Sequence, residues 1–197
     1  MEEDFRLETE RLRLRPYRLE DLDDLHAMFS DPEHMTWYPA PFQREGSLTW
    51  LESQIAGYET PGYALWIVED RVTGEFLGTA GPALRLVEGV DEVEIGWHTR
   101  PGRKGEGIAP EAAAAARDWA FANLDVDHVI SLVRPENRAS CRVAEKIGMH
   151  VDREVDYKGL RHLVYRIDRI TPDPRDGGAA LVLGVPGSTS SAGARPS

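Results

Sequence analysis

The most constraining feature of the sequence is a glycine-rich loop that runs directly into an alanine-rich helix. Residues 100–121 read RPGRKGEGIAPEAAAAARDWAF, with glycines at 102, 105 and 107 and alanines at 112–116. Glycine is costly to order and alanine buries little surface, so the pattern needs a physical reason. Two interpretations are open: the loop cradles an anion, or it is a tight turn that leads into a closely packed helix.

The hydrophobic pattern around this loop predicts a mixed α/β fold. Residues 91–99 suit a strand, and HVISLV at 128–133 is apolar on both faces, as expected of a central strand. A single crossover helix between these two strands is expected to make them a parallel pair within a mostly antiparallel sheet. Further strands are predicted at 10–15, 63–70 and 75–86 and in a final hairpin turning near Lys158–Gly159, and further helices at 20–30, 47–58 and 137–147.

The composition changes near residue 170. Residues 1–170 are predicted to form one domain, whereas 171–197 are rich in Gly, Pro, Ser and Ala and are predicted to be a flexible tail. ALVLGV at 180–185 leaves open an added edge strand or docking onto the domain.

Charge and cysteine content exclude several classes of function. The formal net charge of −11 argues against nucleic acid, whose phosphates need clustered Lys and Arg, and mildly favours a cationic partner such as an amine. Cys141 is the single cysteine, and the six histidines lack metal-type spacing, so no metal is expected. No stretch approaches the roughly 20 apolar residues that span a bilayer. A cytoplasmic protein without a membrane partner is expected.

The loop has the chemistry of an anion site. The first N–H groups of a helix have no partner within the helix, and the helix dipole favours negative charge there. Gly105 and Gly107 allow close approach of the backbone, and Arg103 and Lys104 add positive charge. Two known phosphate loops do not match, because Ile108-Ala109 replaces the Lys-Ser/Thr of the Walker pattern and the dinucleotide fingerprint needs a parallel βαβ unit.

A second feature lies one β–α unit further along the chain. Asn137 and Ser140 stand at the start of the predicted helix that follows strand 128–133. Each alone is more often a capping or first-turn residue than a ligand contact. Their combination with the glycine loop favours a binding site.

These two stretches together resemble a known family. KGEGIAPEA (104–112) followed by PENRASCRVAEKIGM (135–149) is similar to the acetyl-CoA motifs of the GNAT acetyltransferase superfamily. LETERLRLRP (7–16) and EIGW (94–97) resemble the branch that contains the ribosomal-protein N-terminal acetyltransferases. The resemblance covers about residues 6–168. It implies a mostly antiparallel sheet with one splayed parallel strand pair, flanked by helices.

The resemblance implies acetyl-CoA as co-substrate. The loop backbone would bind the pyrophosphate. The strand 94–99 would splay from strand 128–133 and pair through its backbone near 97–99 with the pantetheine arm, and Asn137 would hydrogen-bond that arm. The residues implied are Trp97, His98, Thr99, Lys104, Gly105, Glu106, Gly107, Ile108, Ala109, Asn137 and Ser140.

The resemblance also implies direct transfer of an acetyl group to an amine. Many relatives use a Tyr seven residues after the Asn as proton donor, but Ala144 stands there; in the ribosomal-protein branch the proposed donor falls on Ser140. Glu94 is the candidate base, acting through water. The alternative, which is equally favoured, is that Glu94 is a structural carboxylate that hydrogen-bonds a neighbouring strand. His98 lies on the same strand face and titrates in a suitable range, although a half-buried strand histidine is favoured. Cys141 is interpreted as packing.

Two functions are compatible with this sequence, and a third is disfavoured. The first is an N-acetyltransferase acting on a protein N-terminus or a small cationic amine. The second is a non-catalytic acyl-CoA-binding or regulatory module on the same fold. A nucleotide-binding protein is disfavoured by the missing Lys-Ser/Thr element. The segments around 34–42 and the final hairpin are expected to set the amine acceptor. Trp37, Tyr38 and Phe42 are candidates for the acceptor pocket, although aromatic residues in a connector more often cap the core. A homodimer is common in the family.

Overall fold

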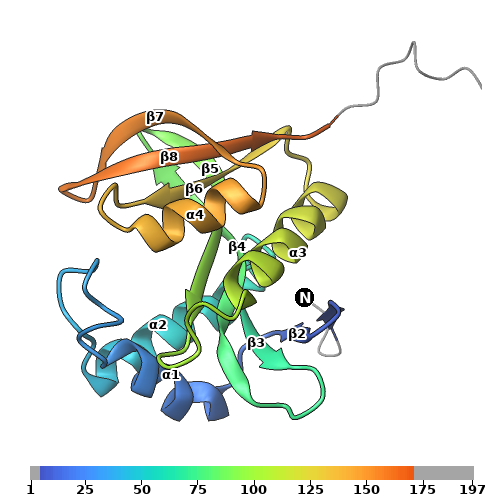
Figure 1. The fold of residues 1–197 in the computed structure, drawn as a ribbon, viewed down its shortest axis with the longest axis vertical. Coiled ribbons are helices and arrows are strands. Elements are labelled where there is room, and N and C mark those ends of the chain that lie inside the picture. The colour runs from blue at the N-terminus through green and yellow to red at the C-terminus, as the bar shows by residue number, and fades with distance from the viewer. Residues whose placement is uncertain (1–4, 171–197) are drawn as a thin grey trace, which may run out of the picture.

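The computed structural model describes residues 5–170, so the predicted tail at 171–197 lies outside the described residues, as do residues 1–4. The described chain forms one eight-stranded sheet in the order β1-β2-β3-β4-β5-β6-β8-β7, accompanied by four α-helices (Figure 1). The strands are β1 (Leu7–Glu8), β2 (Leu12–Arg15), β3 (Trp66–Asp70), β4 (Phe76–Val87), β5 (Val90–Thr99), β6 (His128–Val133), β7 (His150–Tyr157) and β8 (Leu160–Asp168). The helices are α1 (Leu22–Phe29), α2 (Arg44–Gly57), α3 (Ile108–Asn123) and α4 (Arg138–Lys146), and a short 3₁₀ segment, Leu19–Asp21, precedes α1.

The predicted mixed topology is confirmed. Every neighbouring strand pair is antiparallel except β5 and β6, which are parallel and are joined by the crossover helix α3. β5 and β6 pair at Glu94 and Ile130 alone, whereas β4 and β5 pair along their whole length from Gly78↔Thr99 to Val87↔Val90. The parallel pair is therefore splayed, as the family resemblance implied.

Several element boundaries differ from the sequence prediction. Only Leu12–Arg15 of the predicted strand 10–15 is a strand, because the chain turns at Thr9, whose backbone N–H donates to the Leu12 carbonyl over 2.9 Å, and Leu7–Glu8 pairs back as β1. The predicted strand at 63–70 begins at Trp66, and the predicted helix at 47–58 begins at Arg44.

The alanines of α3 explain its place in the core. Ala112, Ala113, Ala116 and Ala120 are at most 1% exposed, and α3 packs against β4 and β5. Side chains this small let the helix backbone lie close to the sheet. Trp119 packs edge-on against Trp66 of β3, with ring centroids 5.0 Å apart. The closely packed helix predicted by the second interpretation of the loop is therefore present, and the loop itself remains to be explained.

Candidate functional site

The loop before α3 presents backbone rather than side chains. Gly105 and Gly107 have φ values of 88° and 81°, in the left-handed region that favours glycine, and Gly107 caps α3. A Cβ at Gly105 would meet no atom within 4 Å, so the space beside this backbone is open. Arg11 of the turn before β2 fixes the loop by donating from Nη1 to the Glu106 carbonyl over 3.0 Å and by pairing with Glu111 in the first turn of α3.

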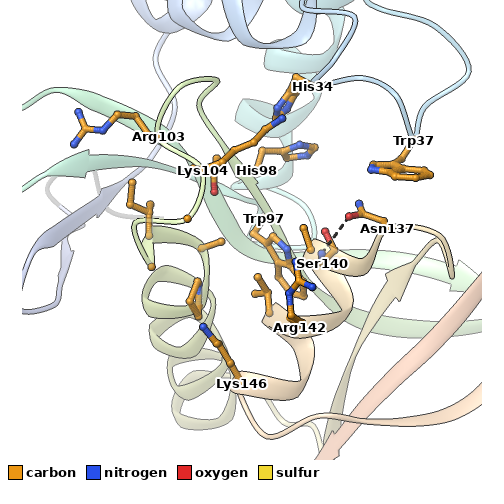
Figure 2. A pocket seen from close by; sticks show the side chains of 18 of the residues that line it. His34, Trp37, Trp97, His98, Arg103, Lys104, Asn137, Ser140, Arg142 and Lys146 are labelled. Atoms are coloured by element: carbon orange, nitrogen blue, oxygen red, sulfur yellow. Dashed lines mark hydrogen bonds between the residues drawn. The ribbon is translucent and has the colours of Figure 1, made fainter.

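A cavity of about 530 Å³ lies beside this loop and has four cationic side chains in its lining. Arg103 and Lys104 come from the loop, and Arg142 and Lys146 from α4 on the opposite wall (Figure 2). One carboxylate, Glu33, also lines it; its side chain is 88% exposed and lies 3.3 Å from Lys104 Nζ. In a chain of net charge −11, this concentration of cations fits an anionic ligand.

The predicted loop residues do not all reach this cavity. Lys104, Gly105, Gly107, Ile108 and Ala109 line it. Glu106 is absent from the lining, and its carboxylate accepts a hydrogen bond of 3.0 Å from Arg103 Nε. Any contribution of Glu106 to ligand binding would therefore come from its backbone.

The end of β5, from Trp97 to Thr99, forms another wall of the cavity, where β5 splays from β6. The His98 carbonyl lies against Gly78 of β4, where a Cβ would collide with it, so the backbone groups of His98 face β4. Backbone groups of successive strand residues point to opposite sides. Those of Trp97 and Thr99 therefore face the gap on the β6 side and are available to an extended ligand.

The start of α4 brings Asn137 and Ser140 to the same cavity. The Ser140 backbone N–H donates to Asn137 Oδ1 over 3.1 Å, so Asn137 is the N-cap that its sequence position favoured (Figure 2). The hydroxyl of Ser140 takes no part in this cap. Cys141 and Ala144 are buried in the core, at 4% and 0% exposure, which confirms the packing interpretation of Cys141.

A second cavity, of about 560 Å³, adjoins the first. The two share six lining residues: Trp37, Tyr38, Trp97, His98, Asn137 and Ser140. The second cavity is otherwise bounded by the segment before α2, the middle of β5, the end of β6 and the β7–β8 turn. Trp37, Tyr38 and Phe42 line it, as expected of candidate acceptor residues. The arrangement allows two ligands to meet beside Ser140 and His98.

Glu94 lies in the wall of the second cavity and is held by two contacts. Its Oε2 accepts a hydrogen bond of 2.7 Å from Arg85 Nε, and its Oε1 accepts one of 3.3 Å from the Leu132 backbone N–H. The second contact crosses the splay to β6, as the structural alternative for Glu94 predicted. The side chain remains 13% exposed.

His98, at the junction of the two cavities, lies beside His34 of the first cavity, and both imidazoles are neutral near pH 7. Their ring centroids lie 5.5 Å apart, and Tyr38 Oη lies 3.4 Å from His98 Nε2. Burial, with further contributions from His34 and Arg85, lowers the pKa of His98 to about 3. Burial and the positive charge of Lys104 lower the pKa of His34 to about 4. An imidazole with so low a pKa is a weak base, so this environment disfavours His98 as the proton acceptor.

These two histidines are expected to make stability depend on pH. Their folded pKa values lie below the unfolded value of 6.5, so unfolding takes up protons once the pH falls below about 6.5. Each histidine should then reduce the free energy of unfolding by up to about 1.4 kcal/mol per pH unit. This loss continues down to pH about 4 for His34 and about 3 for His98.

Urea unfolding between pH about 7 and about 5, where most carboxylates stay ionised, measures the effect. The double variant His34→Gln/His98→Gln should show a shallower slope than the wild type, and exposed His150→Gln serves as control. Equal slopes in the wild type and the double variant would contradict the low pKa values.

Several residues of these cavities were not singled out from the sequence, among them Arg142, Lys146, His34 and Arg85. Arg142 and Lys146 were detectable, because they stand four residues apart and therefore share one face of α4. His34 and Arg85 come from separate segments and meet the site through tertiary packing alone.

Within residues 5–170, no group of three or more His, Cys, Asp or Glu side chains could hold a metal ion. No helix there has the length and apolar character that crossing a membrane requires.

Known proteins share both the sequence pattern and the fold. The family model described as acetyltransferase (GNAT) domain matches residues 11–150. The protein YkkB of Bacillus subtilis (strain 168) is 36% identical over 151 residues, which cover 76% of this chain and 88% of that protein.

Solved structures agree with this match. An acetyltransferase from Agrobacterium tumefaciens C58 is 32% identical with a TM-score of 0.74, over 84% of this chain and 95% of that one. A ribosomal L7/L12 alpha-N-protein acetyltransferase in complex with coenzyme A shares the fold, with a TM-score of 0.69 at 15% identity, over 83% of this chain and 98% of that one. The resemblance of the motifs and the expectation of an acetyltransferase are thereby confirmed. The chain belongs to the GNAT acetyltransferase family.

Proposed function

We propose that this protein transfers an acetyl group from acetyl-CoA to a primary amine by direct attack within a ternary complex. The observation that carries the proposal is the junction of two cavities, one cationic and one aromatic, at Ser140, His98 and Trp97. A reaction between two bound molecules requires such a meeting point, because proximity and orientation supply much of the rate.

The hydrogen-bond donors and cations that line the first cavity match the groups of acetyl-CoA. The backbone N–H groups from Gly105 to Ala109 suit the pyrophosphate, with Lys104, Arg142 and Lys146 close enough to neutralise phosphate charge. The backbone of Trp97 and Thr99 suits the amide groups of the pantetheine arm. Asn137 uses Oδ1 for its cap, which leaves its Nδ2 as a donor toward that arm.

The chemistry that acetyl-CoA supplies is a thioester carbonyl, at which a neutral amine forms an N–C bond while the C–S bond breaks. The acceptor arrives as an ammonium ion, and Glu94 takes up its proton through a water molecule. The Ser140 hydroxyl donates a proton to the departing sulfur. Neutral His98 shapes the wall between these two groups.

The alternative function is a non-catalytic acyl-CoA-binding module. Its support is Ala144, which is fully buried where many relatives have a tyrosine donor. This alternative predicts acetyl-CoA binding without acetyl transfer.

Calorimetric titration with acetyl-CoA, followed by thiol detection over a panel of primary amines, tests the proposal. Saturable binding of acetyl-CoA and CoA, without binding of ATP or NAD, together with amine-dependent thiol release, is expected. A folded protein that binds no CoA would refute the proposal, and binding without thiol release from any amine would favour the alternative.

Ser140→Ala is the informative variant in this assay. The cap at Asn137 uses the backbone N–H of Ser140, so the substitution removes the proton donor and leaves the helix start intact. We expect kcat to fall by about 10²-fold, the lower range for loss of a general acid, while the Kd for acetyl-CoA changes little. Ser140→Cys, which keeps a donor, should retain more activity than Ser140→Ala. Wild-type turnover in Ser140→Ala would remove Ser140 from the acid role.

A further inference from the structure

The charge of the second cavity differs in sign from that of the whole chain. Among the residues that the structure describes, three cationic side chains line it, Arg85, Arg134 and Lys158, against a single carboxylate, Glu94. The chain as a whole carries a formal net charge of −11 and would by itself favour a cationic acceptor. Because the field inside a cleft is set mainly by the groups that line it, the local balance decides which acceptor is attracted.

The three cations are neutralised to different degrees. Arg85 is paired with Glu94 over 2.7 Å. Arg134 faces Glu136 at 3.6 Å, where the carboxylate is 52% exposed, and its own buried Nε has no hydrogen-bond partner among the described residues. The pairing of Arg134 is therefore weak, and a buried donor without an acceptor is unfavourable.

Lys158 is the least neutralised of the three. It lies in the β7–β8 turn with a left-handed φ of 56°, and its Nζ stands 5.3 Å from the centre of the Tyr157 ring. Within residues 5–170 no carboxylate lies within 4.0 Å of it. The turn and the segment before α2 lie on the same side of the molecule (Figure 1). Lys158 therefore offers a positive charge at the border of the cavity.

Several aromatic side chains contribute to the remaining wall of the cavity. Its aromatic side chains are Trp37, Tyr38, Phe42, Trp50, Trp97 and Tyr157. Aromatic walls bind flat or apolar groups through burial of surface and through ring contacts. A polycationic acceptor would meet unfavourable charge here.

We propose that the acceptor is a small amine that also carries a carboxylate and an aromatic or apolar side chain, as an aromatic α-amino acid does. This inference rests on the proposed acetyl transfer. The carboxylate lies toward Lys158 and Arg134, the side chain against the aromatic wall, and the amine toward Ser140. In the balanced reaction the ammonium form loses two protons in all and gains the acetyl group as an amide, while the CoA sulfur gains one proton and one is released.

Matched acceptors test the proposal on the full chain. Phenylalanine, phenylalaninamide and phenethylamine share a side chain and an amine, and only phenylalanine carries a carboxylate; an aminoglycoside represents polycations. We expect kcat/KM for phenylalanine to exceed that for the amide by about tenfold or more, the effect of one partly screened charge contact. In the presence of CoA, calorimetry should likewise show N-acetylphenylalanine binding more tightly than its amide.

Lys158→Glu identifies the residue responsible. The preference for phenylalanine over its amide should fall by about tenfold in this variant and be kept in Lys158→Arg. Arg161→Glu reverses a charge of the same hairpin at a position outside the cavity lining, and should keep the preference. The Kd for acetyl-CoA, measured in each variant, reports whether the first cavity is intact.

The outcomes separate this inference from the proposed function. Equal or better use of the amide or the aminoglycoside overturns the inference and leaves acetyl transfer standing. Acetyl-CoA binding with no acetylation of phenylalanine overturns it as well. Absence of acetyl-CoA binding refutes the proposed function itself.

Discussion

Replacement of Gly105 by tryptophan is expected to weaken acetyl-CoA binding by at least about 100-fold, because the indole would occupy the space beside the loop backbone. Two or more charge-assisted hydrogen bonds, each contributing about 1.5–3 kcal/mol, would be lost, and 1.4 kcal/mol corresponds to about tenfold in Kd. Gly105 is preferred to Gly107, where a Cβ would already lie 3.3 Å from Arg11 Nη2 and would disturb the loop itself. Isothermal titration calorimetry gives the Kd directly.

The matched control is Gly74→Trp. Gly74 also has a left-handed φ, of 74°, and also has open space where a Cβ would stand, but it lies in the β3–β4 turn outside both cavities. Both variants therefore carry the backbone strain of a non-glycine residue at such a φ, about 1–3 kcal/mol. If the two variants bind acetyl-CoA equally well, the loop does not hold the pyrophosphate.

Glu94→Gln is expected to lower kcat by about 10²–10⁴-fold if Glu94 is the proton acceptor, since glutamine keeps the shape and loses the basicity. The acetyl-CoA Kd should stay near the wild-type value, because Glu94 lines only the second cavity. Steady-state kinetics at saturating acetyl-CoA measure the loss. The activity that remains should rise more steeply with pH than in the wild type, because deprotonation of the amine then depends on solvent.

The ion pair with Arg85 requires a second variant. Removing one partner leaves a partly buried charge unpaired, which destabilises a protein independently of catalysis. The double variant Arg85→Gln/Glu94→Gln removes both charges and should recover thermal stability without recovering turnover. Recovery of turnover in the double variant would instead assign Glu94 to the neutralisation of Arg85.

Local sequence signals predicted the parts of this protein that local chemistry determines. The loop glycines, the cap at Asn137, the left-handed turn at Lys158–Gly159 and the apolar β6 each depend on a few neighbouring residues. The alanines of α3 likewise predicted close packing. The strand starts at Leu12 and Trp66, which were predicted too early, lie where tertiary pairing, rather than the hydrophobic pattern, decides where a strand begins.

The parts that sequence reasoning missed depend on contacts between distant segments. Arg85 reaches Glu94 because β4 and β5 pair with Ala83 opposite Glu94, a register that alternation alone does not specify. His34 lowers the tendency of His98 to protonate only because a connector folds onto β5. The cationic lining of the second cavity was hidden by the acidity of the whole chain, since a sum over the sequence contains no information on where each charge lies.

The single backbone pairing between β5 and β6 has a mechanical consequence. It divides the sheet into two panels, β1 to β5 and β6-β8-β7, which adhere through side chains and helices more than through a hydrogen-bonded ladder. A molecule that bonds to Trp97 and Thr99 from within the splay would act as an extra length of strand between the panels. Because a ligand stabilises the state to which it binds, the cohesion of the two panels would then rise and fall with the concentration of the molecule that fills the splay.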